Sequence, residues 1–462
     1  MKATTVCTAS TDGVAAASRL SRPLIRVIGV ICGYLACSSL ALAAWPAPRS
    51  IDERRLADAK VRVVEAEHAT LVTDLPPSPE ADVLPQLIDL ALPHWQRRFR
   101  VSDKRVEGWR LRIYLIEDEA KFRALGLWPN QSQEFQHGLS LGYEVWVRKQ
   151  PTDYYQRHLL LHEATHSFMS TLLGSCGPGW YKEGMAELCG AHSWDPRSRD
   201  LRLAVMPKSR EAAPHWGRVA LIRKAIDEGK ALSIDAVMKI DNRVVLPSES
   251  YAWVWALCAF LDRHPAYRDR FRQAPGWVTS ENFDRRFRSI FANDRAQLDK
   301  EWRLFIETLD YGHDIAREAI DFKTGRALTP DGSQRLTLQT NRGWQSTGVA
   351  VTAGQPVYIT ATGRFTIAQD PDGVPWPCEP NGVTLDYHAG RPLGELLATV
   401  DSGADAFTDG RPIGLTADYT PPASGTLYLR VNDAPNALAD NEGTVEVRVL
   451  PAPQNDQMTR PQ

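Results

Sequence analysis

Inside the stretch HLLLHEATHSFM, which runs from His158 to Met169, His162, Glu163 and His166 interrupt a largely apolar run. His162 and His166 are four residues apart, so on a helix they share one face with their rings about one turn from each other. That spacing suits two nitrogen ligands of one zinc ion, and Glu163 beside them could take a proton from water instead of binding metal. An unpaired carboxylate or imidazole pair in a buried helix would cost several kcal/mol, and a dication removes that cost.

A second acidic pair follows in the segment WYKEGMAE, residues Trp180 to Glu187. Glu183 and Glu187 are again one helical turn apart, where like charges repel unless a cation lies between or beside them. We expect Glu183 to be the third metal ligand and Glu187 to hold the free nitrogen of a ligating histidine. Gly184 inside this helix costs about 1 kcal/mol against alanine, which is explained if the helices around the ion approach closely.

Hydrolysis at such a site also needs a group that stabilises the developing oxyanion. Tyr251, at the start of the helical stretch YAWVW, is the candidate, and a tyrosine that only packs in the core is the structural alternative. His192 and His215 are further candidates. In the predicted mechanism zinc polarises the scissile carbonyl, while Glu163 takes a proton from water and delivers it to the leaving amine.

Together the two segments, His162-Glu163-x-x-His166 and Trp180-x-x-Glu183-Gly184-x-Ala186-Glu187, resemble the gluzincin superfamily of metallopeptidases. The resemblance implies zinc ligation by His162, His166 and Glu183, acid and base catalysis by Glu163, and a supporting carboxylate in Glu187. Sixteen residues separate His166 from Glu183, so the connection between the two helices should be tight. The resemblance also implies that a strand before the active helix forms a sheet edge on which an extended peptide lies. Residues 143–148 occupy that place, with an ordinary structural strand as the alternative.

The elements that must position these residues alternate between strand and helix signals over residues 60–150. Strands are expected at 68–75, 110–116 and 143–148, and helices at 80–99 and 119–125. From 159 to 310 the helical period dominates, and the arginines of 283–309 alternate with acidic residues, which is typical of a solvated helix face. We therefore predict an α+β chain: a zincin-like metallopeptidase domain over residues 45–322, with a mixed sheet and a mostly helical second half.

The composition changes at a predicted linker, residues 323–333, where Gly, Pro, Thr and Asp collect. Short β-rich runs over residues 334–450 predict an all-β sandwich, and residues 451–462 a disordered tail. Landmarks such as GWQSTGV at 343–349 and LYLRVND at 427–433 resemble the calcium-dependent galactose-binding lectin family of bacteria.

This second resemblance implies calcium ligation by Asp433, Asp440 and Asn441, with a carbonyl from Ala437. Several oxygen donors at flexible geometry suit calcium, but Asp and Asn are also common turn formers. Residues 375–382 fall where the family contacts sugar, yet they differ from it, so sugar specificity does not carry over.

The chain begins with a leader pattern. Arginines at 19, 22 and 26 precede an apolar run, residues 27–42, which is closed by Ala43-Ala44. We interpret residues 1–44 as a signal peptide. The run is shorter than the roughly 20 residues that a membrane-spanning helix needs, so no stable span is expected after cleavage. The protein should be periplasmic, on the cell surface or secreted, and lipid anchoring at Cys37 is the alternative.

Four cysteines follow the leader, Cys176, Cys189, Cys258 and Cys378, and they permit three pairings. A disulfide between Cys176 and Cys189 is favoured, because it would close a short loop in an oxidising compartment.

The net charge of -2 and a sequence pI near 6.6 give no reason to expect nucleic acid as a partner. The sequence thus predicts an exported zinc metallopeptidase that acts on peptides or proteins, with a C-terminal domain that could bind a glycan. One alternative is a binding protein that keeps the fold without turnover and acts through its lectin-like domain. The other is a zinc amidase that acts on cell-wall peptides. Glu163 argues against the inactive version, because metal binding needs ligands but no base.

Overall fold

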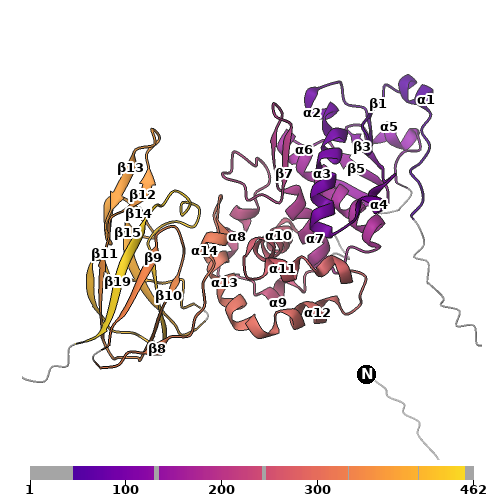
Figure 1. The fold of residues 1–462 in the computed structure, drawn as a ribbon. Coiled ribbons are helices and arrows are strands. Elements are labelled where there is room, and N and C mark those ends of the chain that lie inside the picture. Colours follow the sequence, from indigo (N-terminus) through magenta and orange to yellow (C-terminus); the bar gives the residue numbers. More distant parts are fainter. Residues whose placement is uncertain (1–44, 130–134, 242–245, 331, 404, 453–462) are drawn as a thin grey trace, which may run out of the picture. The chain divides into compact units, whose positions relative to one another are not determined.

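Alternating apolar residues build a mixed five-stranded sheet in the first part of the chain (Figure 1). The computed structural model describes residues 45–129, 135–241, 246–330, 332–403 and 405–452, so the leader, Cys37 and most of the predicted tail lie outside the described residues. The strand order is β1 (Arg62–Glu65), β2 (Ala69–Thr73), β3 (Leu111–Ile116), β5 (Glu144–Arg148) and β4 (Gly138–Leu141). The central strands β2, β3 and β5 are parallel, and β1 and β4 pair antiparallel at the two edges.

The two faces of this sheet follow from the two-residue period of a strand. In β3, Ile113 and Leu115 belong to one apolar core, and Tyr114 and Ile116 to another. The first core is shared with α3 (Leu84–Phe99) and α6 (Asp153–Phe168), and the second with α1 (Glu53–Asp58) and α5 (Glu119–Ala124). Both faces of the sheet are therefore covered, which matches the expected mixed α/β arrangement.

The predicted edge strand at 143–148 is wrong in its position. The strand there, β5, has neighbours on both sides, β3 and β4. The edge is β4, which turns back from β5 through Gly142 in a left-handed conformation (φ 59°). The sequence pattern missed β4 because Gly138–Leu141 is short and only half-buried, so it lacks the alternation that marked the other strands.

Helices dominate the middle of the chain, as expected. They are α7 (Gly179–Gly190), α8 (Arg218–Asp227), α9 (Ile234–Val237), α10 (Ser248–Arg263), α11 (Arg268–Phe271), α12 (Phe283–Ile290), α13 (Arg295–Glu307) and α14 (Ile315–Glu318), after α6. Two short helices, α2 (Pro79–Asp82) and α4 (Asp103–Val106), lie between β2 and β3 in the first part. Short 3-10 turns occupy Ala274–Trp277 and Ala292–Asp294, and a hairpin joins β6 (His192–Asp195) to β7 (Asp200–Leu203).

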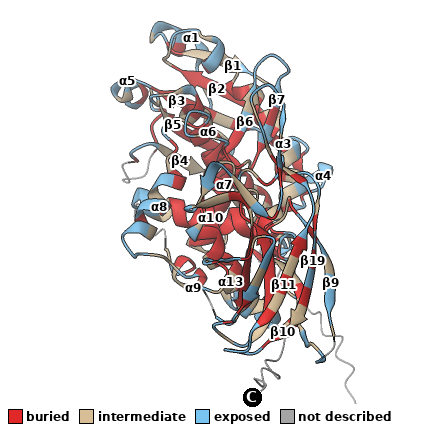
Figure 2. Cartoon of the chain, turned by 90° about the vertical axis from the view of Figure 1, so that its left-hand side faces the viewer, coloured by how far each residue is buried: buried red, intermediate tan, exposed pale blue. Residues whose placement is uncertain are grey.

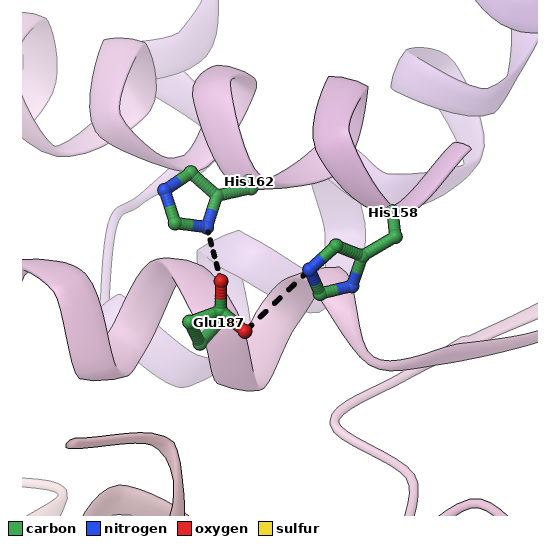
Figure 3. Close-up of side chains that lie close together, drawn as sticks. All are labelled: His158, His162 and Glu187. Carbon is green, nitrogen blue, oxygen red and sulfur yellow. Dashed lines mark ion pairs between the residues drawn. The ribbon is translucent and has the colours of Figure 1, made fainter. Parts of the chain in front are cut away.

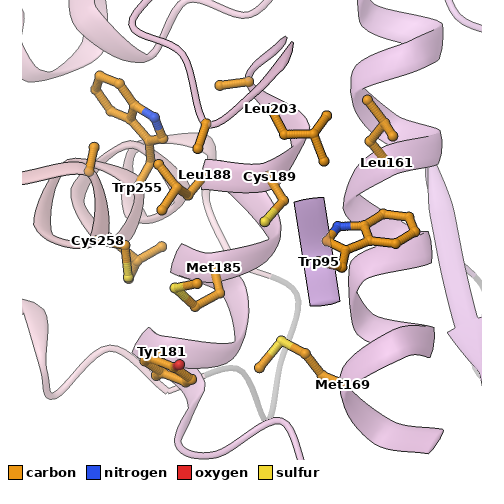
Figure 4. Close-up of a cluster of buried hydrophobic side chains, with 14 of the residues drawn as sticks. Trp95, Leu161, Met169, Tyr181, Met185, Leu188, Cys189, Leu203, Trp255 and Cys258 are labelled. Atoms are coloured by element: carbon orange, nitrogen blue, oxygen red, sulfur yellow. The ribbon is translucent and has the colours of Figure 1, made fainter. Parts of the chain in front are cut away.

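Helices α6, α7 and α10 form the buried centre of this part, and most of their residues are inaccessible to solvent (Figure 2). Thr152 caps α6 by accepting a hydrogen bond from the Tyr155 amide. The helix continues into a π-helical turn, Met169–Leu173, which ends at Gly174 (φ 82°). Only a few residues then lead to α7, so the connection is as tight as the sequence predicted. Apolar side chains from α3, α6, α7 and α10 fill the space between these helices (Figure 4).

The C-terminal part consists of strands. They are β8 (Arg326–Ala327), β9 (Gln334–Gln339), β10 (Gln345–Val351), β11 (Val357–Thr362), β12 (Phe365–Gln369), β13 (Pro375–Cys378), β14 (Asn381–His388), β15 (Arg391–Asp401), β16 (Arg411–Pro412), β17 (Thr416–Tyr419), β18 (Gly425–Val431) and β19 (Thr444–Pro451). One sheet has the order β14-β15-β18-β10-β8, with β16 beside β15, and the other has the order β17-β11-β19-β9. Inward-facing residues of both sheets share one apolar core, as a two-sheet sandwich requires.

The change from helices to strands falls between Glu318, the end of α14, and Arg326, the start of β8. The predicted linker lies across this change, although the described residues belong to a single compact unit and the domain boundary stays a prediction. The described chain is thus a mixed α/β structure with several sheets and a β-rich C-terminal part. Within the described ranges, no helix is both long and apolar enough to cross a bilayer.

Candidate metal centre

Neighbouring turns of α6 and α7 bring His162, His166 and Glu183 together, as the motif spacing predicted. The two histidine Nε2 atoms are 3.1 Å apart, and each is 3.3 Å from Oε2 of Glu183. Metal–ligand bonds of about 2.0–2.1 Å in a tetrahedral site put neighbouring ligand atoms roughly 3.3 Å apart. Three buried ligand atoms therefore stand at the separations that one ion requires.

Glu187 contacts the other ring nitrogen of His162, Nδ1 (Figure 3). Its Oε1 is 3.3 Å from His162 Nδ1, and its Oε2 is 3.5 Å from Nε2 of His158. Arg218 at the start of α8 donates to both carboxylate oxygens, at 2.9 and 3.0 Å. Burial acts to raise the pKa of Glu187, but Arg218 and His158 outweigh it and hold the pKa well below its usual value. A carboxylate fixed in this way sets the ring orientation of His162.

His158, His162 and Glu187 form a second group whose atoms are close enough to share an ion. However, both oxygens of Glu187 already accept hydrogen bonds from the Arg218 guanidinium. The positive charge of this guanidinium would repel a dication bound there. His162 has only its Nδ1 on this side, while its Nε2 faces His166 and Glu183. The group of His162, His166 and Glu183 is therefore the better metal site.

The three ligand residues line a cavity of about 500 Å³, together with Glu163, Tyr251 and residues of β4. Burial raises the pKa of Glu163 to about 7, in the range that suits a general base at neutral pH. Gly138 lies against this carboxylate, because a Cβ atom added there would come 2.6 Å from Glu163 Oε1. The edge strand β4 and the proposed base are thus in direct contact.

Tyr251 also lines this cavity, and its ring centre is 6.1 Å from that of His162. The Arg218 guanidinium lies 5.8 Å from the centre of the Tyr251 ring. The two alternatives, His192 and His215, are not among the lining residues. His192 is buried with its Nδ1 2.8 Å from the Gly190 carbonyl, and His215 is exposed. Tyr251 is therefore the one of the three that reaches the cavity.

Sequence reasoning missed Arg218, His158 and Gly138. His158 stands one turn before His162 on the same face of α6, so its spacing of four was visible in the sequence. Gly190 makes room for its ring, because a Cβ there would be 2.8 Å from His158 Cε1. Nothing in the sequence pointed to Arg218, the first residue of α8, which lies 31 residues after Glu187 in the chain.

The expected disulfide between Cys176 and Cys189 is wrong. All four described cysteines are free thiols. Cys176 lies at the cavity, with its Sγ 3.6 Å from the His166 carbonyl, whereas Cys189 is fully buried among the apolar residues of Figure 4. The short spacing was misleading, because α7 carries Cys189 a full helix length away from the turn that holds Cys176.

In the β-rich part, Asp433 and Asn441 lie together, and each is at most 2% exposed. Asn441 donates from Nδ2 to Asp433 Oδ2 at 2.8 Å, and its buried Oδ1 has no hydrogen-bond partner. Burial raises the pKa of Asp433 to about 6. Asp440, the third predicted ligand, is exposed, and its amide donates to the Ala437 carbonyl at 3.3 Å.

The fold and the site together define a mixed α/β protein with buried His/Glu groups that could hold a metal ion. No family model and no curated protein matches the chain. Among solved structures, the chain is similar to one described as "EclA N-terminal domain; PllA-like lectin", with 23% identity, 26% of this chain and 95% of that chain covered, and a TM-score of 0.21. A TM-score of that size carries no argument about fold or sugar binding.

Proposed function

We propose that this chain is a zinc-dependent metallopeptidase of the gluzincin type that hydrolyses peptide bonds. The observation that carries the proposal is the convergence of three ligand atoms, His162 Nε2, His166 Nε2 and Glu183 Oε2, at separations of 3.1 and 3.3 Å. Two imidazoles and one carboxylate suit zinc better than calcium or magnesium, which prefer oxygen ligands alone. Three protein ligands also leave a coordination position for reaction, as in catalytic zinc sites.

The residues around this site have separate roles in the proposed reaction. A zinc ion held by His162, His166 and Glu183 would supply a Lewis acid that acidifies water and polarises the scissile carbonyl. Glu163 takes a proton from the attacking water as the water oxygen bonds to the carbonyl carbon. Glu163 then passes this proton to the amide nitrogen as the carbon–nitrogen bond breaks, so an acid and an amine are released.

Tyr251 is the proposed donor to the developing oxyanion, because its side chain lines the same cavity as Glu163. Glu187 and Arg218 do not touch the substrate in this scheme. They fix the ring of His162 through a buried pair of charge-assisted hydrogen bonds.

The sheet edge supports a peptide as the substrate. Among the described strands β4 lies at the edge of the sheet, and Gly138, Leu139 and Ser140 line the cavity. An extended peptide can add to such an edge through main-chain hydrogen bonds, and the pairing holds its backbone straight past the catalytic group.

The test is zinc content together with cleavage of a mixed peptide library by the wild type and by Glu163→Gln. We expect about one zinc per chain in both proteins, because Glu163 is not a ligand, and a loss of cleavage on the order of 10²–10⁴-fold in the variant. A matched control is Glu117→Gln, which removes an exposed carboxylate just after β3, outside the cavity.

The outcomes separate the proposal from its alternatives. Zinc without any cleavage that depends on Glu163 would favour a binding protein that has lost turnover. Cleavage confined to cell-wall peptides, with library peptides untouched, would favour a zinc amidase. Absence of zinc from both proteins would refute the proposal as a whole. Export is part of the proposal through the leader pattern, and fractionation of the cells checks it.

A second activity is proposed for the sandwich: cation-dependent binding of a carbohydrate. The observation that favours a cation is the buried Asn441 Oδ1 without a hydrogen-bond partner, beside the buried Asp433 carboxylate. Calcium would satisfy both oxygens, and Asp440 would have to join them. We expect calcium, but not magnesium, to raise the melting temperature of the wild type and to have no effect on Asp433→Asn. A glycan array with and without calcium then tests sugar binding, and a melting temperature indifferent to calcium would contradict the cation site.

A further inference from the structure

The segment that starts at Trp45 lies at one end of the candidate cleft, where it contributes a wall. The Trp45 indole is among the residues that line the cavity, and its Nε1 donates to the Ser170 carbonyl at 3.2 Å. Its ring also packs against Gly142, because a Cβ there would come 2.8 Å from Trp45 Cε3. Trp45 therefore touches both the turn that follows β4 and the π-helical turn that follows α6.

Hydrogen bonds of Arg49 hold the segment that carries Trp45 in place. Four residues after Trp45, the Arg49 amide donates to Glu144 Oε1 at 3.2 Å, and the Arg49 side chain donates to the Trp128 carbonyl at 2.6 Å. The guanidinium also lies 5.1 Å from the centre of the Trp146 ring. Between these two anchors the sequence is Pro46-Ala47-Pro48, and two prolines restrict the backbone of such a short segment.

The order of contacts along β4 tells which side of the scissile bond the wall faces. Gly138, at the start of β4, lies against Glu163, and Gly142, just after its end, lies against Trp45. A peptide that extends this sheet antiparallel to β4, in the more stable of the two pairings, runs in the opposite direction. Its amino end then points towards Trp45 and its carboxyl end leaves past Gly138.

We infer that Trp45 closes the amino-terminal side of the cleft and limits how many substrate residues precede the scissile bond. This inference rests on the proposed peptidase function. An extended strand rises about 3.4 Å per residue, so the stretch from Gly138 to Leu141 gives room for roughly three substrate residues before the indole is met. The substrates are therefore peptides that are cleaved near their amino end. In a longer chain, the scissile bond must lie within about three residues of the amino end.

Two series of synthetic peptides that share one scissile sequence test this inference. One series grows by single residues on the amino side, and the other grows on the carboxyl side. For the wild type we expect kcat/KM to rise up to about three residues on the amino side and then to fall at least about tenfold, as for a steric misfit. Growth on the carboxyl side should carry no such penalty.

In Trp45→Ala the fall on the amino side should disappear, so that kcat/KM no longer decreases beyond about three residues. Trp45→Phe keeps an aromatic wall and should keep most of the limit. Arg49→Ala is a second test of the same inference. It removes the contacts that hold the segment in place without changing a residue of the cavity, so the loss of kcat/KM for peptides that are long on the amino side should become smaller. Circular dichroism and melting temperature show whether each variant is folded.

The results separate the two proposals. If no peptide is cleaved in a manner that depends on Glu163, the peptidase function itself fails. If cleavage occurs but is indifferent to length on the amino side, to Trp45→Ala and to Arg49→Ala, only the inference about the wall is overturned. A penalty on the carboxyl side instead would overturn the proposed direction of the peptide.

Discussion

At the scale of single residues, Gly138 decides how close the edge strand can come to the proposed base. An added Cβ would lie 2.6 Å from Glu163 Oε1 and 2.8 Å from Glu163 Cγ. Gly138 has no positive φ, so alanine is acceptable to the backbone and only the contact changes. We predict that Gly138→Ala lowers kcat/KM on the order of 100-fold, because a displacement of about 1 Å at a catalytic group has effects of that size.

The measurement is steady-state cleavage of one library peptide, together with zinc content by elemental analysis. Zinc content should be unchanged, since no ligand is touched. Gly276→Ala is the matched control, because no atom lies within 4 Å of a Cβ added there. Full activity in Gly138→Ala would mean that Glu163 is free to move, and the proposed contact would lose its importance.

The ligand residues could be predicted from the sequence because their spacing is local. His162 and His166 share one helical face through their own separation, and the acidic pair of α7 was found in the same way. Arg218, Gly138 and Trp45 could not be found like this. Each reaches the site from a distant part of the chain through tertiary packing, and no local pattern records such a contact.

At the scale of elements, Gly184 allows a close approach of two helices, as expected, but the neighbouring helix is not the expected one. A close approach of helices was expected around the ion. The close approach at Gly184 is to α10 instead of α6, because a Cβ there would lie 2.5 Å from Cys258 Sγ and 2.6 Å from the Val254 carbonyl of α10. Helical periodicity predicts a buried face, but it does not say which helix packs there.

A buried charge cluster fastens α3, α10 and α11 together. Asp262 of α10 contacts Arg98 of α3 and accepts from Arg272 Nε, just after α11, at 2.9 Å. Burial acts to raise the pKa of Asp262, but Arg98 and Arg272 outweigh it and hold the pKa at about 2. Because the folded pKa is below the unfolded value of 3.8, this carboxylate stabilises the fold above about pH 4 and loses that effect as the pH falls towards 2.

We therefore predict that Asp262→Asn lowers the free energy of unfolding by about 3–5 kcal/mol at pH 7, since Arg98 would be left buried without its counter-ion. Between pH 4 and pH 2 the gap between variant and wild type should shrink. Urea unfolding over pH 2–7 measures both effects. Asp269→Asn, an exposed carboxylate of α11, is the control and should change little. A gap that stays constant down to pH 2 would contradict the assigned pKa.

At the scale of the whole molecule, a second buried pair joins the helical part to the strands. Arg430 of β18 donates to Glu318 of α14 at 2.8 Å and to the Asp433 carbonyl at 2.9 Å. Both side chains of the pair are almost fully buried. We predict that Arg430→Met costs about 3–5 kcal/mol, because Glu318 would be buried without a partner.

The double variant Arg430→Met with Glu318→Met should recover most of that loss, since a buried ion pair is often replaceable by apolar groups. Chemical unfolding of the wild type, both single variants and the double variant completes the cycle. Additive losses in the double variant would show that the two residues act independently, contrary to the contact.

Fold class and the succession of elements were largely predictable at this scale. The changes of composition marked where helices give way to strands, and several strands begin and end where their apolar alternation does. Composition does not predict which residues join the helical part to the strands. Arg430 stands in β18, whose apolar residues predict a strand but not that its arginine is buried against α14.

The junction has a consequence for producing the two parts separately. An apolar cluster around Trp344, Phe407 and Tyr428 of the strands includes Leu304 of α13 and Ile320. A chain divided near residue 323 would expose this cluster to water on one piece and leave Glu318 and Arg430 without each other. Each half expressed alone should aggregate, and the two should be recovered in soluble form only when they are synthesised together.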